Sequence, residues 1–128
     1  MKHFFGNDLL LNNPSSQMIY NHIKNLPIVD YHCHLDPEII YKNPYINDIG
    51  ELWMAGDHYK WRAMRLNGID EKYITGDATY KEKFLKYGSI MPSLAGNPLY
   101  YWSHLELKNI FDINMPLNKD TAELIYEK

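Results

Sequence analysis

The chain has 128 residues, of which 45% are hydrophobic and 23% are charged, a balance typical of one soluble globular domain or part of one. The formal net charge is −3 without a stripe of lysine and arginine, which argues against a nucleic-acid partner. No apolar stretch is long enough to cross a membrane, and the one cysteine, Cys33, excludes an internal disulfide framework and favours a reducing, cytoplasmic location.

The first predicted element is a helix that begins after Asn13-Pro14-Ser15, with Ser15 as its N-cap. Apolar residues recur there at the spacing of one helical face, which we expect to be buried. That face consists of Met18, Ile19, His22, Ile23 and Leu26. On such a stripe, a histidine is expected to be a half-buried core residue rather than a ligand.

A short buried strand is predicted next, over about residues 27–35, because β-branched and aromatic residues lie there between Pro27 and Pro37. Side chains alternate faces along a strand, so His32 and His34 share one side, with Cα atoms about 6.6 Å apart. Two imidazoles at that spacing can bind one zinc ion, whereas on a helix they would point about 200° apart. The alternative is a chance His-x-His pair that binds no metal.

The rest of the chain predicts helices after a polar loop over residues 38–47. Each helix is marked by a residue type that commonly caps helix N-termini. The caps and the segments that follow them are Asp48 (residues 52–55), Asp57 (58–66), Thr79 (a helix with Phe84 and Tyr87), Asn97 (99–111) and Asn118 (119–128). No second segment reads as a strand. An unpaired strand leaves backbone groups unsatisfied, so we expect the chain to be the opening piece of something larger.

His58 and Tyr59 stand in the first turn of the helix that Asp57 caps. A histidine suits proton transfer near neutral pH, and a tyrosine hydroxyl can donate or relay a proton, so the pair can face a substrate. The alternative is structural, with Tyr59 packed inward beside Ala63 and Leu66 and with His58 at the surface. On the pattern alone, the structural interpretation is preferred.

These motifs together resemble the uronate isomerase (glucuronate isomerase) family of the amidohydrolase superfamily. The resemblance rests on separated stretches in one order along the chain: 27–37, 56–65, 74–77 and 96–107. It implies the α/β fold class, as the N-terminal piece of a distorted (β/α)8 TIM-type barrel, which takes about 250 residues. Residues 1–128 would then belong to one domain, with the first barrel strand at about 27–35 and a helical insertion over about 48–128.

The resemblance also implies the chemistry. Family members interconvert D-glucuronate with D-fructuronate and D-galacturonate with D-tagaturonate, which is an aldose–ketose isomerisation of hexuronates through an enediol. His32 and His34 match the pair that binds a divalent metal, which we expect to be zinc, and His58 and Tyr59 match the active-site pair. The third metal ligand and the arginines that hold the substrate carboxylate would lie beyond Lys128, so this chain alone is expected to be inactive.

The partners expected from this resemblance are a small-molecule hexuronate and, in the full-length protein, further copies of itself, with no nucleic acid and no membrane. Two other functions remain open at this point. One is a metal-dependent hydrolase of the same superfamily, which would share the His-x-His pair. The other is a non-catalytic helical binding module whose histidines are structural.

Overall fold

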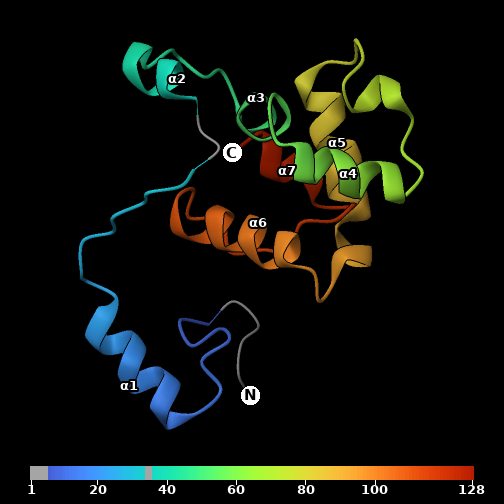
Figure 1. The fold of residues 1–128 in the computed structure, drawn as a ribbon. Coiled ribbons are helices and arrows are strands. Elements are labelled where there is room, and N and C mark those ends of the chain that lie inside the picture. Colours follow the sequence, from blue (N-terminus) through green and yellow to red (C-terminus); the bar gives the residue numbers. More distant parts are fainter. Residues whose placement is uncertain (1–5, 34–35) are drawn as a thin grey trace. The chain divides into compact units, whose positions relative to one another are not determined.

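The computed structural model describes residues 6–33 and 36–128. The chain divides into two compact units, Met1–Pro44 and Tyr45–Lys128 (Figure 1). The described residues form helices and loops, and none of them lies in a β-strand. No helix among the described residues is long and apolar enough to cross a membrane.

The first unit contains two helices, α1 (Pro14–Ile23) and α2 (Pro37–Lys42). The expected N-cap of α1 was wrong by two residues: Asn13 is the cap, and its Oδ1 accepts from the Ser16 N–H at 2.8 Å. Pro14 favours this start, since proline fits the first helical position. No described residue of this unit is buried, so His22 is exposed, contrary to the half-buried position expected for it.

The predicted strand over about residues 27–35 is wrong for its described part, and with it the α/β barrel assignment. Residues 27–33 have no regular secondary structure, and the side chains of Ile28 and Tyr31 are 92% and 98% exposed. A strand requires backbone hydrogen bonds to a neighbouring strand, and the described residues supply none. The His32 N–H instead donates to Asp30 Oδ1 at 3.1 Å. β-Branched residues favour a strand, but they do not supply the neighbouring strand with which it would have to pair.

The second unit contains five α-helices and two short 3₁₀ turns. Their bounds are α3 (Ile49–Met54), α4 (His58–Leu66), η1 (Glu71–Tyr73), α5 (Tyr80–Ile90), η2 (Met91–Leu94), α6 (Pro98–Asn109) and α7 (Ala122–Tyr126). The predicted caps of α3 to α6 are confirmed, and the side chain of each accepts from a backbone N–H of the first turn. The last helix begins later than predicted, because Asn118 Oδ1 accepts from the Asp120 and Thr121 N–H groups and closes a turn.

Helix α5 lies at the centre of the core of the second unit, where it packs against α3, α4 and α7 (Figure 1). Its Phe84 and Tyr87 are fully buried, and Trp53 of α3 meets them with ring centroids 5.7 and 6.1 Å away. Gly88 allows α7 to approach, since a Cβ there would lie 2.8 Å from the Ala122 Cβ. The core therefore fixes α3, α4 and α7 around one helix.

His104 of α6 is a structural part of this core. It is 2% exposed, and its Nε2 accepts from the Leu117 N–H at 2.9 Å. The proton therefore sits on Nδ1, which donates to the Tyr100 carbonyl oxygen at 2.6 Å. Burial lowers the pKa of His104, while the bond to Tyr100 opposes this in part. The neutral ring thus links α6 to the loop that precedes α7.

Candidate active site

His58 and Tyr59 are the first two residues of α4. Both are exposed, Tyr59 by 48%, and their rings lie with centroids 4.3 Å apart at an interplanar angle of 33°. Of the structural alternative, Ala63 is buried and His58 is exposed as that alternative expects, whereas Tyr59 and Leu66 are exposed and do not pack inward. The two side chains therefore present an imidazole and a phenol together at the helix start, which is a combination suited to proton transfer.

Asp57 holds this first turn in place from the position before it. Its Oδ1 accepts from the Tyr59 N–H at 2.9 Å and from the Lys60 N–H at 3.2 Å. Its Oδ2 lies 2.5 Å from Lys60 Nζ. Burial alone would raise the pKa of Asp57, but the Lys60 charge and these hydrogen bonds lower it below its usual value. The carboxylate is therefore charged at neutral pH and has three donors.

Lys60 is a buried lysine, with 9% of its side chain exposed. Its Nζ lies 5.3 Å from the centroid of the Trp53 ring, within the range of a cation–π contact. The next residue, Trp61, donates from Nε1 to the Met54 carbonyl oxygen at 2.8 Å. Both residues thus attach the start of α4 to α3.

The sequence identified Asp57 only as a helix cap, and it placed Lys60 in the same helix without any functional role. The available signal was the spacing, since an aspartate and a lysine three residues apart can pair on one helical face. The sequence does not show that Lys60 is buried, because this burial depends on Trp53, which belongs to another helix. Lysine is almost never fully buried unless its charge is paired, so the burial of Lys60 indicates that its ion pair with Asp57 is part of the packed structure.

The predicted metal ligands fall in the first unit. His32 is exposed in a segment without regular structure, and His34 lies outside the described residues. Among the described residues, no three His, Cys, Asp or Glu side chains are grouped so as to hold a metal ion. Catalytic zinc usually has three protein ligands, so the described residues do not by themselves make a zinc centre.

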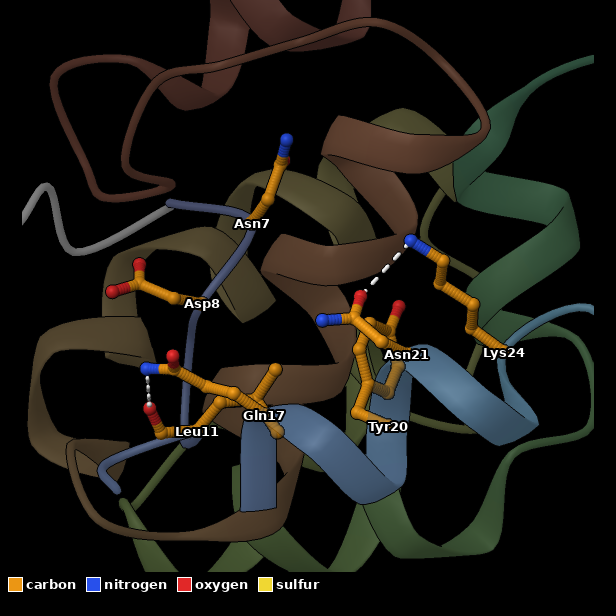
Figure 2. A pocket seen from close by; sticks show the side chains of 7 residues that line it. All are labelled: Asn7, Asp8, Leu11, Gln17, Tyr20, Asn21 and Lys24. Carbon is orange, nitrogen blue, oxygen red and sulfur yellow. Dashed lines mark hydrogen bonds between the residues drawn. The ribbon is translucent and has the colours of Figure 1, made fainter. Parts of the chain in front are cut away.

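The first unit also has an open pocket of about 230 Å³ (Figure 2). Its walls come from the segment before α1, from α1 itself and from Lys24 directly after it. Two hydrogen bonds join lining residues: Gln17 donates from Nε2 to the Leu11 carbonyl oxygen at 3.1 Å, and Lys24 donates to Asn21 Oδ1 at 3.0 Å. No residue predicted to be functional lines this pocket, which therefore has no part in the predicted site.

The comparisons with known proteins first define the class. The model of the glucuronate isomerase family matches residues 1–128, so the chain belongs to that family.

The individual relatives carry the name uronate isomerase. The chain is 53% identical to the one from Caldicellulosiruptor bescii and 52% identical to the one from Brachyspira hyodysenteriae, and in both cases the match covers 100% of this chain and 28% of the relative. The crystal structure of uronate isomerase from Thermotoga maritima is similar with a TM-score of 0.93 and 44% identity, over 98% of this chain and 28% of that one. The chain thus spans a little over a quarter of the length of these relatives.

Proposed function

We propose that this chain is part of an enzyme that interconverts the aldose and ketose forms of hexuronates. The observation that carries the proposal is the match of all 128 residues to the glucuronate isomerase family, with relatives named uronate isomerase. The proposed substrate pairs are D-glucuronate with D-fructuronate and D-galacturonate with D-tagaturonate. Because the chain spans 28% of its relatives, the proposal applies to a full-length enzyme in which these residues are the N-terminal part of one domain.

The reaction moves hydrogen from C2 to C1 of the open-chain sugar. A base removes the C2 proton while the C1 carbonyl oxygen gains a proton, which gives an enediol. The O2 hydroxyl then loses its proton as C1 gains one, which leaves a ketone at C2. No external oxidant or reductant is consumed, and the proton transfers need acids and bases that the protein positions beside C1 and C2.

His58 and Tyr59 are the proposed acid and base groups. His58 assists ring opening, since imidazole accepts and donates protons near neutral pH. Tyr59 donates a hydrogen bond or relays a proton beside the C1 and C2 oxygens. The contact between their rings, 4.3 Å between centroids, and the exposure of both side chains support this assignment.

A divalent metal, zinc, belongs to the same proposal, with His32 and His34 as two of its ligands. Imidazole nitrogen is a suitable zinc ligand, and at least one further ligand has to come from elsewhere in the full-length protein. Bound zinc would polarise and orient substrate oxygens. The exposed thiol of Cys33 is compatible with the proposed cytoplasmic location, and homo-oligomerisation is proposed for the full-length enzyme.

The test of the activity uses a full-length uronate isomerase polypeptide that carries this sequence. Incubation with D-glucuronate or D-galacturonate, followed by NMR, should show the matching ketose, whereas amide and ester substrates should remain intact. The 128-residue chain alone should give no turnover. Hydrolysis without isomerisation would contradict the proposal and favour the hydrolase.

The metal is tested separately by elemental analysis of the same full-length protein. His32→Asn should lower the bound zinc per chain, because it removes one ligand. His22→Asn is the matched control, since His22 is an exposed histidine of the same unit, and it should leave the zinc content unchanged. Equal zinc content in both variants would remove His32 from the metal site.

A further inference from the structure

We propose that Asp57 and Lys60 are positioning residues that hold the His58–Tyr59 pair in its reactive orientation. This inference rests on the proposed isomerase function and adds two residues to its active site. At the start of α4, the ion pair between Asp57 and Lys60 contacts both the backbone of Tyr59 and the core of the unit.

The Asp57 carboxylate makes more bonds than a helix cap needs. One oxygen is enough to cap a helix, and Oδ1 does so through the N–H groups of Tyr59 and Lys60. The second oxygen, Oδ2, binds Lys60 Nζ at 2.5 Å. With both oxygens bound, the carboxylate cannot turn without breaking a hydrogen bond to the Tyr59 backbone or to the lysine.

Lys60 connects this carboxylate to the core. Its ammonium lies 5.3 Å from the centre of the Trp53 ring, and Trp53 is itself 2% exposed and packed against Phe84 and Tyr87 of α5. The cation is thus held between an aromatic face and a carboxylate. A shift of the Asp57 side chain would therefore have to move Lys60 against a packed aromatic group.

Stability alone is a poor reason for such a pair. Removing two charges from water costs free energy that their attraction only partly offsets, and apolar residues of similar size are often equally stable. A charged pair differs from an apolar contact in having one preferred geometry. Here that geometry controls the first turn of α4, with Lys60 and Trp61 attached to α3 while His58 and Tyr59 remain exposed.

The test separates the ion pair from the helix cap in the full-length enzyme. Asp57→Ser keeps a good N-cap residue but removes the second oxygen, and Lys60→Met keeps the cap and removes the charge. We expect each variant to lower kcat at least about tenfold, with a smaller change in KM, because small displacements of reacting groups cost up to about 10²-fold. Asp48→Ser is the matched control, since Asp48 caps α3 of the same unit, and it should change kcat by less than about twofold.

A double-mutant cycle shows whether the pair acts through Tyr59. If it does, adding Asp57→Ser to Tyr59→Phe should cost much less than the tenfold seen alone, since the group being positioned is already absent. A full additional loss on both Tyr59→Phe and His58→Asn would overturn the positioning role, as would normal kcat in folded Asp57→Ser or, where that variant does not fold, in Lys60→Met. An unsubstituted enzyme without isomerase activity would overturn the proposed function itself, and this role with it.

Discussion

The two units use the same local devices to start helices but differ in what they bury. A capping box opens α1 in the first unit and α5 in the second, and both helices are about three turns long. Helix α5 buries five of its eleven residues, whereas α1 buries none of its ten. A cap thus determines where a helix begins, while tertiary contacts determine how strongly it is held.

This difference bears on the proposed active site. His58 and Tyr59 project from a helix whose first turn is attached to a packed core through Lys60 and Trp61. His32 lies in a segment of the first unit that has no regular structure and no buried residue among those described. The proposed proton-transfer pair therefore has its supporting structure within its own unit, and the described part of the proposed metal-binding pair does not.

The largest expected effect is on core packing. Phe84→Ala should lower the free energy of unfolding of the second unit by about 3–5 kcal/mol, because a fully buried aromatic ring is replaced by a cavity. Ile19→Ala in α1 should change the same quantity by less than about 0.5 kcal/mol, since Ile19 is 57% exposed. Denaturant unfolding of the 128-residue chain, followed by near-UV circular dichroism, measures both. Similar losses would contradict the contrast between the units.

A smaller effect is expected where α5 and α7 approach. Gly88→Ala would place a Cβ 2.8 Å from the Ala122 Cβ and 3.0 Å from Leu117 Cδ1. Overpacking of this kind costs about 1–3 kcal/mol, part of which the better helix propensity of alanine offsets. Gly56→Ala is the matched control, because nothing lies within 4 Å of its Cβ, and it should be neutral or stabilising. Thermal melts compare the two, and a higher melting temperature for Gly88→Ala would show that the helices can separate freely.

The smallest effect expected is a pH dependence from His104. Burial lowers the pKa of His104 below the ordinary 6.5, so as the pH falls the unfolded chain takes up this proton before the folded protein does. The free energy of unfolding of the second unit should therefore decrease below about pH 6.5. In His104→Gln this decrease should be weaker between about pH 5 and 7, since the titrating group is gone. Equal slopes in urea titrations of both proteins would remove His104 as the source.

The parts of the fold that the sequence predicted are those determined within a few residues. Asp48, Asp57, Thr79 and Asn97 cap their helices as expected, because a cap needs only its own side chain and the next backbone N–H groups. The strand predicted at about residues 27–35 was wrong over its described residues, 27–33, because a strand depends on a partner that no local pattern can provide.

The same distinction between local features and tertiary contacts applies to the candidate site. The adjacency of His58 and Tyr59 at the start of a helix was predictable, since one cap places both. The role of Lys60 was not, because its burial depends on Trp53 from α3, and hydrophobic periodicity gives no signal for a buried cation. Contacts between helices therefore have to be observed before such positioning residues can be recognised.

We propose above all that His58 and Tyr59 carry the proton transfers of a hexuronate isomerase. The most direct test measures kcat for D-glucuronate isomerisation by the full-length enzyme with His58→Asn and with Tyr59→Phe, both nearly isosteric changes. Each should lower kcat by at least about 10²-fold, the lower range for loss of a general acid or base, while circular dichroism remains unchanged. A near-normal kcat in either variant would contradict the claim for that residue.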